Sequence, residues 1–92
     1  MHVVVCYDIV CDRRRGRLFR RMKDFLPRVQ KSVFEGEIPD WRLSKLTEMI
    51  MTQIDPKEDT VRLYQLCRRC LPSVQVLGTG PHVVESLDDI VI

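Results

Sequence analysis

His2-Val3-Val4-Val5-Cys6-Tyr7-Asp8-Ile9 is the stretch that decides the fold. Its β-branched and apolar residues predict a strand, and because the apolar run is nearly continuous we expect both faces of that strand to be buried. Asp8 interrupts the run, and the turn-forming pair Cys11-Asp12 follows it. The stretch lacks the basic leader and cleavage site of a signal peptide, so we expect a cytoplasmic protein.

Turn-forming residues divide the rest of the chain into further elements. We predict a helix from Asp12, its N-cap, to Leu26, where Pro27 ends it. A second helix is expected from its cap Asp40 to about Gln53, with an inner stripe of Trp41, Leu43, Leu46, Met49 and Ile50. Further strands are predicted at residues 28–38, 60–66, 74–77 and 87–92.

These elements predict an α+β protein with a ferredoxin-like βαββαβ sheet, two helices on one face and an extra C-terminal strand. One domain should span residues 1–92, with the first and third strands central and parallel. One face of the sheet remains uncovered, and so short a chain buries a modest share of its surface. We therefore expect a second copy to cover that face, forming a homodimer in which the last strand pairs with an exposed edge.

Charge is distributed unevenly although the net charge is only +2. Nine of the fifteen basic residues lie between Arg13 and Lys31, where Asp24 is the only acid. The first helix should present Arg14, Arg17 and Arg21 on one face, flanked by Arg13 and Arg20. Guanidinium groups match phosphate oxygens bidentately, which favours nucleic-acid binding over a merely solvated face. No stretch approaches the roughly 20 apolar residues of a membrane span, so no membrane partner is expected.

Asp8 is the candidate for chemistry, since a carboxylate at the end of a central strand must be solvated, paired or bound to a cation. By strand parity it shares a face with Val4 and Cys6. One interpretation is an ion pair with Arg14, Arg15 or Arg62. The other is a magnesium ligand, because Mg²⁺ binds through one or two carboxylates plus phosphate. A symmetric dimer could present two such aspartates across its axis.

The cysteines leave three alternatives open. Cys67-Arg68-Arg69-Cys70 is a C-x-x-C pair, and Cys6 and Cys11 lie near the other end of the chain. They could form a four-thiolate zinc site, a reversible disulfide at the C-x-x-C pair, or ordinary packing and turn residues. A zinc site usually shows two C-x-x-C pairs and this sequence has one, which counts against zinc; of the three, the third alternative is favoured. His2 and His82 have no catalytic companions in the sequence.

Several segments occur in an order that resembles a known family: residues 4–9 followed by Asp12-Arg13-Arg14-Arg15, then 28–35, 54–64 and 76–78. Together they are similar to the small CRISPR-associated endoribonuclease and spacer-acquisition family, the non-integrase member of the CRISPR adaptation pair. The resemblance covers nearly the whole chain. It implies a ferredoxin-like homodimer that bridges a CRISPR integrase in a heterohexamer-type complex, binds the dsDNA of a spacer precursor, and in some members cleaves ssRNA or dsDNA.

The resemblance also implies roles for individual residues. Asp8 becomes the Mg²⁺ ligand and catalytic residue, with Tyr7 and Phe34 as supporting residues. The family's helix arginines correspond to members of the cluster Arg13–Arg17. Together with the helix face described above, the candidate nucleic-acid-binding residues are Arg13, Arg14, Arg15, Arg17, Arg20 and Arg21. Two alternatives to a metal-dependent endonuclease stay open, namely a non-catalytic DNA-binding adaptor and a stand-alone ferredoxin-like ribonuclease toxin.

Overall fold

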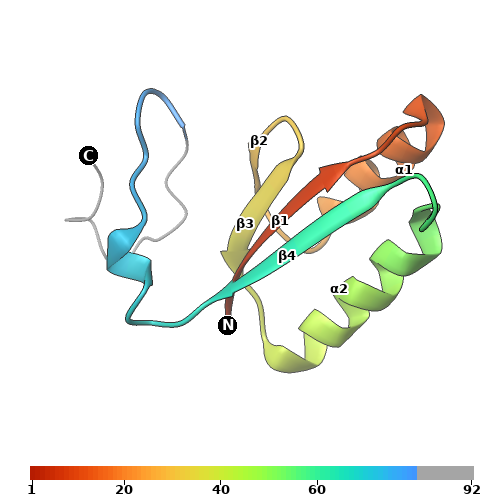
Figure 1. Cartoon of the computed structure of the whole chain (residues 1–92). Coiled ribbons are helices and arrows are strands. Elements are labelled where there is room, and N and C mark those ends of the chain that lie inside the picture. The colour runs from red at the N-terminus through yellow and green to blue at the C-terminus, as the bar shows by residue number, and fades with distance from the viewer. Residues whose placement is uncertain (81–92) are drawn as a thin grey trace.

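Residues 1–80 form a four-stranded sheet with two helices in the computed structural model, which describes this part of the chain (Figure 1). The elements in chain order are β1 (His2–Asp8), α1 (Asp12–Met22), β2 (Arg28–Gln30), β3 (Val33–Glu37), α2 (Asp40–Gln53), β4 (Thr60–Leu66) and a short 3-10 helix η1 (Leu71–Ser73). The predicted α+β, ferredoxin-like class is confirmed. No helix in these residues is long and apolar enough to cross a membrane.

The strand order is β2-β3-β1-β4, and every neighbouring pair is antiparallel. The first strand is central, as predicted. The predicted third strand, residues 60–66, is instead the edge strand β4 and runs antiparallel to β1, so the prediction that these two strands are both central and parallel is wrong. A tight turn joins β2 to β3 and reverses the chain, whereas the crossover through α1 keeps β2 parallel to β1. The strand β3 therefore lies between two parallel strands and runs against both.

The single strand predicted at 28–38 is two strands. Lys31 and Ser32 form the turn between β2 and β3, and the backbone N–H of Tyr7 donates to the Ser32 carbonyl at 3.1 Å. A bulge shifts the register between Arg28 and Gln30. In the sequence of 28–38, neither of the two alternating sets of residues is purely apolar. The hairpin explains this pattern, because the alternation of a strand changes phase where the chain reverses.

The helix boundaries differ from the prediction at three points. The helix α1 ends at Met22 instead of Leu26, because the backbone tightens into i→i−3 hydrogen bonds ahead of Pro27, as in Asp24 N to Arg21 O at 3.2 Å. Asp12 and Asp40 were expected as N-caps, but each is the first residue inside its helix, and Cys11 and Pro39 are the caps. Both acids still lie where the helix dipole favours negative charge.

The two C-terminal strand predictions have different outcomes. Residues 74–77 are irregular in the structure, directly after η1, so that prediction is wrong. The proline at position 72 in η1 favours a turn and lacks the N–H that a strand would need. The predicted strand 87–92 and His82 lie outside the described residues.

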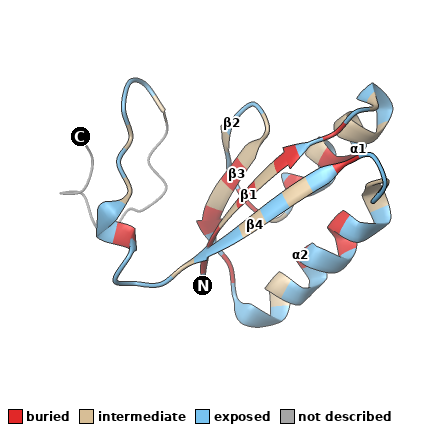
Figure 2. Ribbon diagram, viewed as in Figure 1, coloured by how far each residue is buried: buried red, intermediate tan, exposed pale blue. Residues whose placement is uncertain are grey.

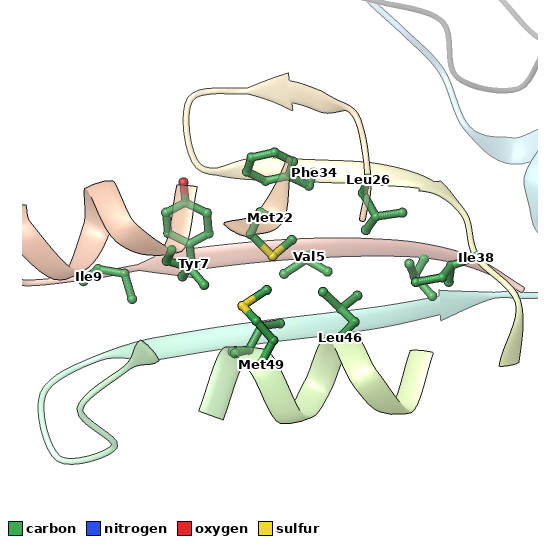
Figure 3. Packing of buried hydrophobic residues seen from close by; sticks show 12 residues of the cluster. Val5, Tyr7, Ile9, Met22, Leu26, Phe34, Ile38, Leu46 and Met49 are labelled. Carbon is green, nitrogen blue, oxygen red and sulfur yellow. The ribbon is translucent and has the colours of Figure 1, made fainter. Parts of the chain in front are cut away.

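The hydrophobic core lies between the helices and one face of the sheet (Figures 2 and 3). From β1, the core takes Val3, Val5 and Tyr7, which are buried, while Val4 and Cys6 on the opposite face are only half-buried. Burial of β1 on both faces was therefore a wrong prediction, because both helices pack on the same face. We call the opposite face, with Val4, Cys6 and Asp8, the open face.

The helix α2 matches its predicted bounds and most of its predicted stripe. Leu46, Met49 and Ile50 are buried, and Leu43 packs against them, but Trp41 is 63% exposed. Trp41 lies in the first turn of the helix, beyond the edge of the core. The inner residues of α1 are Leu18 and Met22, both fully buried, which leaves the opposite side of that helix to its arginines.

Candidate functional site

Asp8 is the last residue of β1 and is exposed on the open face. In the sheet register it lies opposite Thr60 of β4, and Cys6 lies opposite Arg62. Arg62 is therefore a diagonal neighbour of Asp8 on the same face, a spacing of roughly 7–8 Å between Cα atoms that long side chains can bridge. The chain leaves β1 at Asp8 and enters α1 four residues later.

Asp8 forms no ion pair within residues 1–80, and the three arginines considered as its partners have other contacts. Arg14 pairs with Asp59 and Glu58, Arg15 with Asp12, and the Arg62 guanidinium lies 3.5 Å from the hydroxyl of Tyr64. The hypothesis of an ion pair between Asp8 and one of these arginines is wrong in this structure. The carboxylate is left facing solvent.

Asp59 is the residue that sequence reasoning missed. Its side chain is fully buried and accepts four N–H bonds: from Arg14 Nε at 2.8 Å and Nη2 at 3.2 Å, from Val10 N at 3.0 Å and from Asp55 N at 2.8 Å. The hydrogen bond from Arg14 is the main reason why the pKa of Asp59 is held far below its usual value, and the same bond raises the pKa of Arg14. In the sequence, Asp59 was only one of several scattered acids.

This carboxylate joins the loop after β1 to the turn before β4. Val10 belongs to the loop that follows Asp8, and Asp55 opens the turn that leads into Thr60. Arg15 reinforces the loop by donating twice to the Ile9 carbonyl, at 2.7 and 3.2 Å. Hydrogen bonds to charged groups are the stronger class, so the backbone that carries Asp8 is held from both sides.

The arginines predicted to bind nucleic acid fall into two groups. Arg13, Arg17, Arg20 and Arg21 are exposed and form no ion pair within residues 1–80; we call them the arginine face. Arg14 and Arg15 instead hold the loop, although the Arg15 side chain keeps 43% exposure. The face lies on the side of α1 away from Leu18 and Met22, as the helical period requires.

Tyr7 and Phe34 lie in the core, on the face opposite Asp8. Phe34 is fully buried and Tyr7 is 6% exposed, and their rings stack with centroids 6.3 Å apart (Figure 3). Phe34 also contacts Phe19, with centroids 5.9 Å apart. Burial raises the pKa of Tyr7. The structure therefore places these two residues behind the site, where they support the strands that carry it.

The cysteines and histidines do not assemble a metal site within residues 1–80, where no three His, Cys, Asp or Glu side chains gather. Cys67 and Cys70 approach each other, with 3.3 Å between their sulfurs, but neither Cys6 nor Cys11 joins them. A four-thiolate zinc site is therefore a wrong hypothesis for these residues. His2 is buried and its Nε2 contacts Glu35 at 2.8 Å, a structural role.

The donor set around Asp8 fits magnesium only in a limited way. Asp8 offers one free carboxylate, whereas the oxygens of nearby Asp59 are already engaged by N–H groups. Magnesium keeps several waters and is bound through one or two carboxylates together with phosphate. One chain thus supplies a partial site, which the phosphate of a nucleic acid and an Asp8 from a second copy could complete.

The fold and site define a class: small ferredoxin-like proteins with a solvent-facing carboxylate at the end of a central strand and a basic helix directly after it. A family model described as "CRISPR associated protein Cas2" matches residues 1–74. The chain belongs to the Cas2 family of CRISPR-associated proteins. A role in CRISPR adaptation follows in general terms from that membership.

Known relatives agree with this assignment. A Chloroflexus aurantiacus protein named CRISPR-associated endoribonuclease Cas2 1 is 33% identical over the whole of both chains. The crystal structure of Streptococcus pyogenes Cas2 has a TM-score of 0.73 and 29% identity, covering 85% of this chain and all of that one. A chain of a partial Cas6-RT-Cas1–Cas2 complex has a TM-score of 0.65 and 32% identity, covering 74% of this chain and 75% of that one.

Proposed function

We propose that this protein acts in spacer acquisition as a nucleic-acid-binding homodimer that bridges a CRISPR integrase, and that Asp8 gives it a magnesium-dependent endonuclease activity. The observation that carries the proposal is the exposed carboxylate of Asp8, which ends a central strand and forms no ion pair within residues 1–80. The endoribonuclease named in the Chloroflexus relative supports the chemistry. The chain from the Cas1–Cas2 complex supports the integrase partner.

Nucleic-acid binding is assigned to the arginine face. Its four guanidinium groups have no acidic partner within residues 1–80, so a phosphate backbone would not have to displace one. Each phosphate contact releases counterions, which makes the binding depend on salt and not on base sequence. Such binding suits both the dsDNA of a spacer precursor and ssRNA. Arg14 and Arg15 contribute by fixing the loop, and Arg15 remains exposed enough to reach a ligand.

Homodimer formation is assigned to the open face of the sheet. Val4, Cys6 and Val33 are half-buried there, and Tyr64 of β4 is 46% exposed. The register confirms that these side chains are neighbours on one face, since Val4 lies opposite Tyr64 and Cys6 lies opposite Val33. Glu35 also lies opposite Val4, and Arg62 opposite Cys6, so charged side chains border these apolar ones. The apolar side chains favour burial against a second copy, and the charged ones could pair across it. Asp8 borders the same face, so dimerisation would bring two carboxylates toward one groove.

In catalysis, Asp8 is proposed to hold Mg²⁺ against the phosphate of a bound strand. The ion, when bound, supplies positive charge opposite the phosphate oxygens. The residues of this chain orient the reaction: Asp59 and Arg15 hold the loop that carries Asp8, and the arginine face places the strand beside it. Phosphodiester cleavage then depends on the Asp8 carboxylate, which is the metal-holding group of the proposal.

A cleavage assay on ssRNA and dsDNA, with magnesium added or chelated, tests the activity. Asp8→Asn should lower cleavage by at least about 100-fold, because losing a direct metal ligand should cost no less than losing a group that only orients a ligand, which costs roughly 10–100-fold. Asp24→Asn is the matched control. It removes the same charge from another exposed aspartate, which lies just after α1, and this variant should cleave at the wild-type rate. Equal cleavage by wild type and Asp8→Asn would refute the enzymatic half of the proposal.

A non-catalytic adaptor is the second candidate, favoured by the match to a chain of a Cas1–Cas2 complex. It predicts that Asp8→Asn supports spacer acquisition in cells as well as wild type does, whereas neutralising the arginine face abolishes acquisition. Loss of acquisition in both variants would instead favour a catalytic role in the cell. Acquisition that continues without the protein would exclude both candidates.

A further inference from the structure

Cys67 and Cys70 form a side-chain cluster that the proposed function does not use. They lie in the turn between β4 and η1, and both are exposed. Their sulfurs are 3.3 Å apart. Two backbone bonds close the turn, from Cys70 N to Cys67 O at 2.9 Å and from Leu71 N to Cys67 O at 3.2 Å. The turn therefore holds two accessible thiols side by side.

We propose that Cys67 and Cys70 are a redox-active dithiol, which small anionic disulfides such as glutathione disulfide oxidise reversibly to an intramolecular disulfide. A disulfide bond requires the sulfurs to approach to roughly 2.0 Å. Both side chains are exposed, so rotation about their own side-chain bonds covers the remaining distance without displacing the core. The flanking Arg68 and Arg69 are exposed and positive, which attracts an anionic oxidant.

Cys67 is the attacking thiol and Cys70 the resolving one. The Cys70 thiol and the backbone N–H groups of Cys70 and Arg69 face the Cys67 sulfur, and these contacts lower the pKa of Cys67. The contact with Cys67 raises the pKa of Cys70. Because the thiolate is the nucleophile, Cys67 reacts first near neutral pH.

The reaction proceeds in two exchanges. The Cys67 thiolate attacks one sulfur of the oxidant, breaking the oxidant's disulfide bond, forming a Cys67 mixed disulfide and releasing one thiolate. Cys70 then loses its proton to solvent and attacks the Cys67 sulfur, which forms the Cys67–Cys70 bond and expels the second thiolate. The pair loses two electrons, and the oxidant gains them as it becomes two thiols.

Cys11 provides an internal control because it is a reactive thiol without a resolving partner. Backbone N–H groups of Arg14 and Arg13 lower the pKa of Cys11, yet within residues 1–80 its sulfur makes no contact with another cysteine of the kind that joins Cys67 and Cys70. Its reaction with a small disulfide should stop at the mixed disulfide. Cys6 is half-buried in the sheet and should react more slowly than the exposed thiols.

The test is intact-protein and peptide mass spectrometry of the full chain after incubation in glutathione buffers of increasing oxidised fraction. Wild type and a Cys6→Ser/Cys11→Ser variant should both lose two hydrogen atoms in the peptide containing Cys67 and Cys70, and added reductant should restore them. Cys70→Ser should accumulate a glutathione adduct on Cys67. Cys67→Ser should acquire its adduct on Cys70 more slowly than Cys70→Ser acquires one on Cys67, because the backbone N–H groups of Cys70 and Arg69 still face the Cys67 sulfur in Cys70→Ser, whereas the Cys70 sulfur has fewer such donors.

Either of two results would overturn the proposal. One is that the peptide with both cysteines stays reduced, or carries only mixed disulfides, while Cys11 is modified. The other is that the two single variants acquire adducts at the same rate, which would contradict the assignment of Cys67 as nucleophile. Circular dichroism of each variant confirms that the serines leave the fold intact, so that a change in reactivity reports on the thiols.

Discussion

Replacing Phe34 tests whether this residue stabilises the core or contacts the substrate. Phe34 is fully buried, and its ring centroid lies 6.3 Å from that of Tyr7 and 5.9 Å from that of Phe19. Truncating such a side chain costs about 3–5 kcal/mol through lost burial and a cavity. Since a small domain has roughly 5–15 kcal/mol in total, Phe34→Ala should remain folded only marginally. Its Tm should fall on the order of 20 °C, at about 4–8 °C per kcal/mol for this size.

Thermal unfolding followed by circular dichroism measures the effect, and cleavage or nucleic-acid binding is then measured well below each Tm. Phe34→Leu keeps most of the volume, should cost roughly 1–2 kcal/mol, and should retain activity. Trp41→Ala removes a larger but exposed ring and should change stability by no more than about 0.5 kcal/mol. If Phe34→Ala kept the wild-type Tm but lost activity, Phe34 would contact the substrate and the core placement would be refuted.

Three further predictions concern the loop, the arginine face and the open face. Folding lowers the pKa of Asp59, so its stabilising contribution is present above the unfolded value of about 4 and is lost as the pH falls below it. Asp59→Asn should therefore lower Tm at pH 7, and the difference in Tm between this variant and wild type should shrink below about pH 4. A difference in Tm that does not change with pH would contradict the ion pair. Neutralising three residues of the arginine face together, by Arg13→Gln, Arg17→Gln and Arg20→Gln, should weaken the salt dependence of duplex DNA binding. The slope of the logarithm of the binding constant against the logarithm of the salt concentration should fall by about 3, at about 0.9 per phosphate contact. An unchanged slope would show that these residues do not contact the DNA. Val4→Asp should convert a dimer into a monomer in sedimentation velocity, and a variant that sediments like wild type would exclude the open face as the dimer interface.

The sequence predicted correctly those elements whose periodic pattern of apolar residues lies within one continuous segment. The helix at 40–53 and the strand at 60–66 have the predicted bounds, because their periodicity is long and undisturbed. The hairpin at 28–37 was missed because its turn, Lys31-Ser32, carries no glycine, proline, asparagine or aspartate, and serine is a weaker turn signal than these residues. That error also misplaced the strand at 60–66. It was counted as the third strand and expected beside β1 in the centre of the sheet, whereas β3 of the missed hairpin occupies the central position and β4 lies at the edge.

The candidate site was predictable in part. The position of Asp8 at the end of a strand follows from the sequence, and so does the excess of arginine on the next helix. The sequence does not show which arginines remain available to bind nucleic acid, because Arg14 pairs with Asp59, 45 residues away along the chain. Contacts of that kind depend on the tertiary fold. The burial of Phe34 likewise depends on the phase of a hairpin that the sequence did not reveal.

The central claim is that Asp8 presents a free carboxylate that holds a divalent cation. The most direct measurement is the anomalous scattering of manganese, a magnesium substitute, in crystals of the protein grown with a short nucleic acid. The account predicts a peak beside the Asp8 carboxylate and next to a phosphate, absent in Asp8→Asn crystals. A peak only elsewhere, or an Asp8 side chain tied to an arginine with no metal near it, would contradict the account.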